Sequence, residues 1–208
     1  MFFNEKIQNI YNQLLYLLSQ FKSICAKNLN NLPLYINKLI IGKNKLPFYT
    51  NATVEDLDLN QYNYIISIED YAFYDCKNLM NITIPNSITT IGGYAFYNCE
   101  SLTEVTIPNS VTTVGNYAFF GCTSFTNITI PASVTSIKYA AFKNCINLQE
   151  IIIPNSVTQI DNMVFENCIN LNNAVLPESI ITINHGAFHK CVSLKSITIP
   201  DSVISIGE

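Results

Sequence analysis

The amino-acid sequence predicts an α/β-type repeat solenoid, in which short units stack on one another. The stretch Ile84-Pro85-Asn86-Ser87-Ile88-Thr89-Thr90-Ile91 returns in similar form every 23 residues. Prolines keep this interval at Pro85, Pro108, Pro131, Pro154, Pro177 and Pro200, and cysteines keep it at Cys76, Cys99, Cys122, Cys145, Cys168 and Cys191. Self-similarity with a fixed period of about 20–50 residues is the signature of stacked repeats.

Charge is distributed unevenly along the chain. Residues 1–50 hold six lysines and one acid, whereas residues 51–208 hold five lysines and fourteen acids, and arginine is absent. Contacts with phosphates supply most non-specific affinity for nucleic acid, so the acidic repeats argue against a nucleic-acid partner. Lysine alone cannot make the bidentate contacts with which arginine recognises phosphate or carboxylate.

Residues 1–53 are expected to form a helical or irregular cap region, separate from the repeats at 54–208. Apolar side chains at intervals of three and four predict a helix over about residues 5–27: Ile7, Ile10, Leu14, Leu17, Phe21 and Ile24. We consider three roles for this helix. It covers the open end of the stack, it associates with another copy as a coiled coil, or it binds a membrane surface through its lysines and Phe2-Phe3.

The expected location is cytoplasmic, with the cell surface as the alternative. Polar residues interrupt any hydrophobic core of a signal peptide, and no stretch reaches the ~18 apolar residues of a membrane-spanning helix. Seven cysteines without a CxxC pair favour a column of buried free thiols over a disulfide framework, which is typical of a reducing compartment.

Residues 54–208 contain about six full repeats and a partial one, and each part of the repeat has a physical reading. Ile82 and Ile84 point inward from a short strand with Thr83 outward, and the proline that follows ends the strand. The serine two residues later is expected to bond backbone groups of the turn. Ile88 and Ile91 begin a second apolar column, either extended or in a short turn.

The remaining repeat positions predict two further buried columns and a left-handed turn. Phenylalanine recurs at Phe73, Phe96, Phe119, Phe142, Phe165 and Phe188, and cysteine follows three residues later. We expect both columns to be interior. Gly92, Gly115 and Gly207 are expected to adopt a left-handed backbone, as are Asn98 and Gly121.

The pattern L-x-x-I-x-I-P-x-S-V-x-x-I-x-x-x-A-F-x-x-C closely resembles the BspA-like leucine-rich repeats, over about residues 54–208. The resemblance implies a curved solenoid with a parallel sheet on its concave face and irregular or short helical turns on its convex side. It also implies non-catalytic binding, since known members include surface adhesins. Phe125 in place of leucine, and the weaker strand at Ala174 and Leu176, depart from the pattern.

No combination of residues predicts catalysis, a cofactor or a metal centre. The two histidines, His185 and His189, lie four residues apart and lack an evident third ligand. The recurring serines follow the repeat interval and are read as structural. We therefore expect that the protein is not an enzyme.

Two departures from the repeat are candidate partner-binding surfaces. On the expected concave face, Ile152 and Val175 replace threonine in an outward-facing row, flanked by Glu104 and Glu150. A contiguous exposed apolar patch of this kind indicates binding. On the turn side, aromatic side chains flank the Ala-Phe motif in three successive units: Tyr71, Tyr74, Tyr94, Tyr97, Tyr117 and Phe120. Either the amino-terminal helix, a second subunit or a partner covers these side chains, or the rings stack on one another with their hydroxyls in solvent.

The sequence thus predicts a non-catalytic module for protein–protein recognition, most simply an intracellular scaffold. The alternatives are a cell-surface adhesin of the BspA-like type and a membrane-peripheral protein anchored by residues 1–27. The unpaired strand expected near Ile197–Ile199 adds end-to-end association, and the amino-terminal helix offers a second route to self-association.

Overall fold

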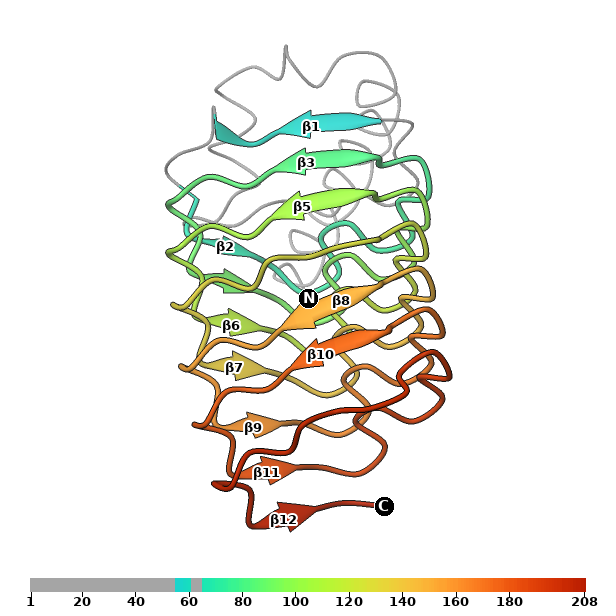
Figure 1. Cartoon of the computed structure of the whole chain (residues 1–208). Coiled ribbons are helices and arrows are strands. Elements are labelled where there is room, and N and C mark those ends of the chain that lie inside the picture. Colours follow the sequence, from blue (N-terminus) through green and yellow to red (C-terminus); the bar gives the residue numbers. More distant parts are fainter. Residues whose placement is uncertain (1–54, 61–64) are drawn as a thin grey trace, which may run out of the picture. The chain divides into compact units, whose positions relative to one another are not determined.

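The computed structural model describes residues 55–60 and 65–208, which lie in the compact unit Ile41–Glu208. They form a parallel β-solenoid of about six turns, with strands of two or three residues (Figure 1). No helix occurs in this part of the chain, which corrects the α/β description. The helix expected over residues 5–27, with its cap region 1–53, lies outside the described residues.

Three-residue strands form the first sheet, called sheet I, seen in the upper part of Figure 1. Each has a buried central residue between two exposed ones, because side chains alternate along an extended chain. Isolated bridges Thr106↔Thr129 and Asn127↔Glu150 continue the pairing between its two groups of strands. The strands are β1 (Asp56–Asp58), β3 (Asn81–Thr83), β5 (Glu104–Thr106), β8 (Glu150–Ile152) and β10 (Asn173–Val175).

Two-residue strands form two ladders, β2-β4-β6-β7 and β9-β11-β12, which are together called sheet II. They decide between the two interpretations of the second apolar column. That column is extended, and residues 23 apart pair in parallel, as in Ile68↔Ile91. The strands are β2 (Ser67–Ile68), β4 (Thr90–Ile91), β6 (Thr113–Val114), β7 (Ser136–Ile137), β9 (Gln159–Ile160), β11 (Thr182–Ile183) and β12 (Ser205–Ile206).

A segment of turns, called the arc, carries the Ala-Phe motif from sheet II back to sheet I. In the first coil its backbone is left-handed at Tyr71 (φ 63°) and again at Asp75 (φ 58°), and the same pair of positions recurs in later coils. Left-handed residues four apart cannot belong to a right-handed helix, so helical turns are excluded here. Backbone N–H groups of the arc instead donate to the next coil, as from Phe96 to the Ala118 carbonyl at 2.7 Å.

The solenoid interior is a set of aligned side-chain columns. Phenylalanine rings stack between coils, with Phe96 lying 5.1 Å from both Phe73 and Phe119 between ring centroids. The six repeat cysteines are buried free thiols, which confirms that prediction. Each thiol from Cys99 onward donates to a carbonyl of the preceding coil, as from Cys145 Sγ to the Phe119 oxygen at 3.2 Å. No polar or charged residue is buried in the described part of the chain.

The serine column links adjacent coils and not its own turn. Ser133 Oγ donates to the Val111 carbonyl of the preceding coil at 2.7 Å, and the same bond recurs from Ser110, Ser156, Ser179 and Ser202. The turn after each proline is closed by the backbone, as from the Ile88 N–H to the Pro85 oxygen. The hydroxyls therefore hold the stack together.

The prediction of a left-handed backbone at Gly92, Gly115 and Gly207 is wrong. The left-handed positions fall two residues later, at Tyr94 and its equivalents, and at Asn98 and Gly121 as expected. Glycine occupies position 115 for another reason. A Cβ there would lie 2.6 Å from the Gly92 carbonyl carbon. Close approach of successive coils excludes a side chain at this point.

Candidate functional site

Ile152 and Val175 form an exposed aliphatic pair on the outer face of sheet I. They are direct partners in the β8–β10 ladder, and their side chains are 57% and 45% exposed. Thr83, Thr106 and Thr129 hold the same position in preceding coils, so the pair interrupts a polar row. The predicted adjacency is confirmed, and the name "aliphatic pair" is kept for these two residues below.

The two glutamates predicted to flank the pair lie at different distances from it. Glu150 is on strand β8, two residues before Ile152 and on the same face, and its carboxylate accepts a 2.6 Å hydrogen bond from Asn173 Nδ2. Glu104 is on β5, and the coil containing Asn127 separates it from Glu150. Only Glu150 is therefore an immediate neighbour of the aliphatic pair.

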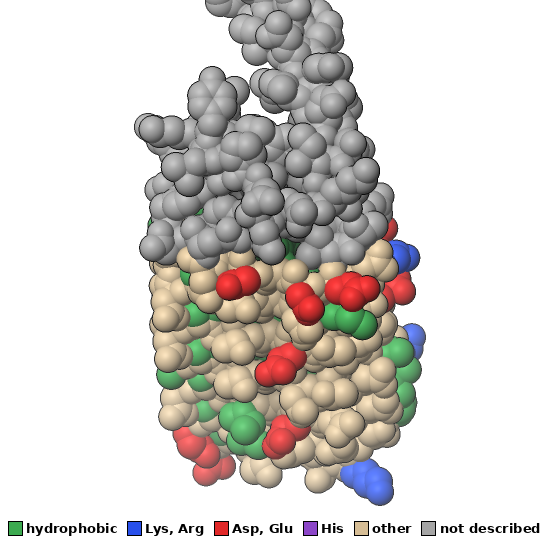
Figure 2. Space-filling view, turned by 90° about the horizontal axis from the view of Figure 1, so that it is seen from above, with side chains coloured by type: hydrophobic (Ala, Val, Ile, Leu, Met, Phe, Trp, Pro, Cys, Tyr) green, Lys and Arg blue, Asp and Glu red, His purple; other side chains and the backbone are tan. Residues whose placement is uncertain are grey.

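Sequence reasoning missed two acids on the same face, Asp56 and Asp58. Both are exposed on β1, where Asp56 pairs with Asn81 and accepts a 2.6 Å hydrogen bond from its amide. The first unit is offset by 25 residues and not 23, so reading at the regular interval does not find them. A space-filling view shows acidic side chains scattered over one face and lysines only at its margins (Figure 2).

The six predicted aromatic side chains form two stacked columns on the arc, called the aromatic ladder. One column contains Tyr71, Tyr94 and Tyr117, with 4.8 Å between successive ring centroids. The other contains Tyr74, Tyr97 and Phe120, at 4.9 and 4.5 Å. The two rings of each coil are inclined to one another by between 42° and 62°. The structure thus brings together all six residues.

The aromatic ladder ends where the side chains of the following coils change. The Tyr139 ring meets Tyr117 edge-on at 5.1 Å, and its hydroxyl lies 3.2 Å from Met163 Sδ. In the second column, the position after Phe120 is occupied by Lys143, and its Nζ forms a 2.7 Å ion pair with Glu166. Burial and a hydrogen bond to Tyr139 raise the pKa of Tyr117 to about 12.

Further exposed aliphatic residues occur in the carboxyl-terminal coils. Ile181 and Ile204 lie on adjacent coils next to sheet II, joined by a 2.9 Å backbone hydrogen bond. Ile169 and Val192 form a similar pair after the cysteine column. Sequence reasoning did not single out these residues. The printed sequence does show that Ile181 and Ile204 occupy the repeat position that Thr112 and Thr135 hold in earlier coils.

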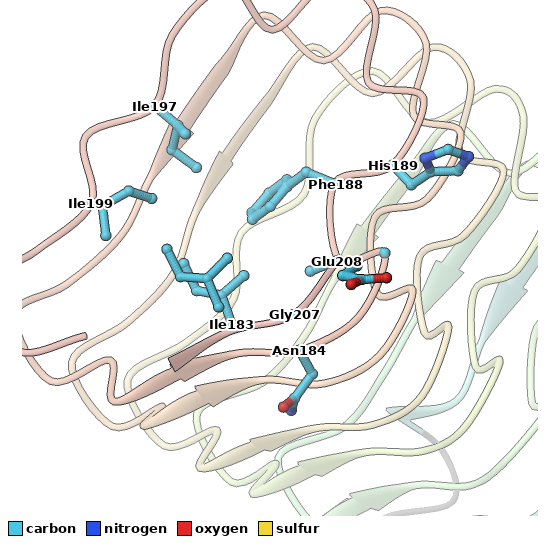
Figure 3. A pocket seen from close by; sticks show the side chains of 11 residues that line it. Ile183, Asn184, Phe188, His189, Ile197, Ile199, Gly207 and Glu208 are labelled. Carbon is cyan, nitrogen blue, oxygen red and sulfur yellow. The ribbon is translucent and has the colours of Figure 1, made fainter. Parts of the chain in front are cut away.

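An apolar cavity of about 260 Å³ lies at the last described coil (Figure 3). Ile183, Phe188 and Ile197 line it, with Ile199 beside them and Glu208 at its margin. These side chains belong to columns that are buried in earlier coils. The cavity is therefore lined by the same apolar columns that form the solenoid interior.

The recurring serines and cysteines are held in structural roles. Burial raises the pKa of the Cys122, Cys145 and Cys168 thiols well above the ordinary range, which keeps them protonated and poorly nucleophilic. Among the described residues, no three His, Cys, Asp or Glu side chains gather to hold a metal. The same part of the chain has no helix long and apolar enough to cross a membrane.

The 23-residue interval, the parallel strands and the buried columns define a leucine-rich-repeat solenoid. Six copies of the BspA type leucine rich repeat region match residues 40–172 and 91–208, so the chain belongs to this family. Comparison with curated proteins finds no match. The family is one whose members generally act in protein interaction or surface adhesion.

Several solved structures are similar to this chain. A leucine rich cell surface protein from Faecalibacterium prausnitzii is 33% identical over 74% of this chain, with a TM-score of 0.68. A leucine rich repeat protein from T. pallidum is 28% identical over 78% of this chain and 77% of its own, with a TM-score of 0.74. One from Bacteroides ovatus is 29% identical over 78% of this chain, with a TM-score of 0.72. The chain spans 44% of the F. prausnitzii protein and 43% of the B. ovatus protein.

Proposed function

We propose that the protein is a non-catalytic recognition module that binds a partner protein through the outer face of sheet I. The observation that carries this proposal is the aliphatic pair, Ile152 and Val175, exposed side by side on a face that is otherwise polar. Exposed apolar side chains in contact with each other favour an interface, whereas isolated ones need no explanation. Family membership supports a binding role in general and does not identify the partner.

The surroundings of the pair favour a partner with matching chemistry. Glu150 lies beside Ile152, and Glu104, Asp56 and Asp58 continue the acidic character of the face. A partner surface with a central aliphatic or aromatic side chain and peripheral lysines or arginines would bury the pair and pair with the carboxylates. Such an arrangement of an apolar centre and a polar rim is typical of protein interfaces.

A double substitution with a matched control tests this proposal. Ile152→Thr with Val175→Thr restores the threonine row of the earlier coils, so folding is expected to be retained. Ile181→Thr with Ile204→Thr changes an equally aliphatic pair on adjacent coils at the other sheet. Proteins captured by the wild-type chain and cross-linked to it should be lost with the first variant and kept with the second. Capture of the same partners by both variants would refute the proposal.

A direct experiment can distinguish a cytoplasmic scaffold from a cell-surface protein, and each location has one observation in its favour. The similar F. prausnitzii protein is described as a leucine rich cell surface protein, which supports an adhesin-like role. The cytoplasmic scaffold is supported by the column of free thiols. Labelling intact cells with a membrane-impermeant reagent distinguishes the two, since only a surface protein would be labelled.

Two further expectations stand as proposals. Residues 1–53 are proposed as a helical cap region, with self-association and membrane-surface binding as the alternatives for the segment 1–27. The apolar cavity at Ile183, Phe188 and Ile197 is proposed as the contact for end-to-end association. Light scattering of the wild-type chain and of the Ile197→Lys variant tests end-to-end association, because a lysine buried in the contact would oppose it.

A further inference from the structure

The central rings of the aromatic ladder, Tyr94 and Tyr97, present ring edges and hydroxyl groups to solvent, and not ring faces. Both faces of Tyr94 are covered by the stacked rings of Tyr71 and Tyr117, and both faces of Tyr97 by Tyr74 and Phe120. The central rings therefore cannot stack on a sugar or on a cation. A ligand of this surface must accept hydrogen bonds from phenols and pack against apolar edges.

The hydroxyls of the central rings are available for such bonds. Within the described residues, the Tyr94 and Tyr97 hydroxyls make no hydrogen bond, whereas the Tyr117 phenol is hydrogen-bonded to Tyr139. The ladder thus offers two donors on its central coil, with 5.6 Å between the centroids of their rings, beside two inclined columns of apolar edges. Tyrosine in this setting is typical of binding surfaces, because its ring packs while its hydroxyl bonds.

The spacing of the ladder matches one peptide conformation. A polyproline II helix makes no internal hydrogen bonds, so its carbonyls need donors, and it repeats every three residues, or about 9 Å. The ring centroids are 4.8 Å apart from Tyr71 to Tyr94 and again from Tyr94 to Tyr117. Two steps of the ladder therefore advance by nearly the length of one polyproline II turn. Alternate residues of a β-strand repeat at about 6.7 Å, which does not fit the step.

The charge around the ladder selects a basic ligand. Between residues 69 and 100 the chain carries four carboxylates, Glu69, Asp70, Asp75 and Glu100, and one cation. That cation, Lys77, is already paired with Glu100 at 2.9 Å and lies 3.7 Å from Asp75. The coils that carry the ladder are therefore acidic. A lysine- or arginine-containing partner complements them.

We propose that the aromatic ladder binds a basic, proline-rich segment of a partner protein in the polyproline II conformation. Prolines three residues apart would pack against ring edges on alternate coils, with their carbonyls accepting from Tyr94 and Tyr97. Basic residues beside the prolines would face Glu100 and its neighbours. This surface is separate from the aliphatic pair on sheet I, so each proposal can fail without the other.

A binding measurement on the full chain tests the proposal. The probe is a short fluorescent peptide with proline at every third position and lysines between, compared by anisotropy with a peptide of the same composition in scrambled order. We expect the scrambled peptide, and one with glutamate in place of lysine, to bind at least about fivefold more weakly. Equal binding of the ordered and scrambled peptides, or no binding of either, would overturn the proposal.

Variants that keep the stacking locate the contact. Tyr94→Phe with Tyr97→Phe removes the two donors and leaves the rings in place, so thermal unfolding should be unchanged while affinity falls roughly five- to tenfold. Glu100→Gln should weaken binding more at low salt than at high salt, with Glu178→Gln, an exposed acid on a distant coil, as its control. Ile152→Thr with Val175→Thr should leave peptide affinity unchanged. Unaltered affinity of the double tyrosine variant would contradict the assignment of the site.

Discussion

Residues 65–125 and residues 126–208 bury the same columns of side chains. Phenylalanine, cysteine and branched aliphatic residues recur in both halves, and they are buried to an equivalent depth in all but the last coil. Their outer surfaces differ. The first half carries the aromatic ladder, whereas the second carries the Lys143–Glu166 ion pair and Met163 at corresponding positions, and it holds the aliphatic pair on sheet I.

The comparison shows which residues the stacking of coils constrains. An inward residue must fit between its equivalents in the coils before and after, so the same type recurs. An outward residue meets only solvent and its neighbours in the same row, so it can vary without loss of the fold. Surface differences between equivalent coils are therefore where binding specificity is expected.

The thiol column gives the largest expected change in stability, at high pH. Burial raises the pKa of Cys99, Cys122, Cys145 and Cys168 far above the ordinary value of about 8.5, and that of Cys191 to about 11. Above pH 8.5 the unfolded chain loses these protons and the folded chain keeps them. Stability should then fall by roughly 1.4 kcal/mol per thiol for each pH unit, until the folded pKa is reached.

Urea unfolding in reductant between pH 7.5 and 9.5 measures this loss. The two halves should differ at the last coil, where burial of Cys191 is least complete and the pKa rise is smallest. A thiol-specific reagent is expected to modify Cys191 before Cys122 or Cys145, as judged by mass spectrometry of digested protein. A stability that does not change with pH across this range would contradict the buried column.

Removal of a stacked phenylalanine ring should lower the free energy of unfolding by about the same amount in either half. Phe96 lies between two rings in the first half, and Phe165 lies between Phe142 and Phe188 in the second, at 5.7 and 5.4 Å. Both side chains are fully buried. Phe96→Ala and Phe165→Ala are each expected to lower the free energy of unfolding by about 3–5 kcal/mol, measured by urea titration. A much smaller cost for one of them would show that the interiors are not equivalent.

The serine column offers the smallest expected effect and an internal control. Ser156 Oγ donates to the Val134 carbonyl at 2.5 Å, whereas the buried Ser87 Oγ makes no hydrogen bond within the described residues. Ser156→Ala should cost about 1 kcal/mol of unfolding free energy, and Ser87→Ala should be neutral or slightly stabilising. Thermal denaturation of the two variants decides this. Equal destabilisation would mean that the bond between coils contributes nothing.

Much of the architecture could be read from the printed sequence, because parallel stacking places residue i beside residue i+23. This relation predicts the pairing of Ile152 with Val175, the alignment of the phenylalanines and the burial of the cysteines. It also grouped Tyr71, Tyr94 and Tyr117 into one row. The first unit escaped this reading, since its offset of 25 residues hid Asp56 and Asp58.

Other features depend on the cross-section of the coil, which the repeat interval does not contain. The interval left open whether the second apolar column is extended, and it did not predict the left-handed backbone at Tyr94 and its equivalents. It did not predict that the Ser133 hydroxyl reaches the preceding coil, and it left open whether the ladder rings stack on one another. A repeated sequence determines which residues are neighbours between coils because translation along the stack is regular. How the chain turns within one coil, and so which atoms meet, is decided only by packing of the three sides against each other.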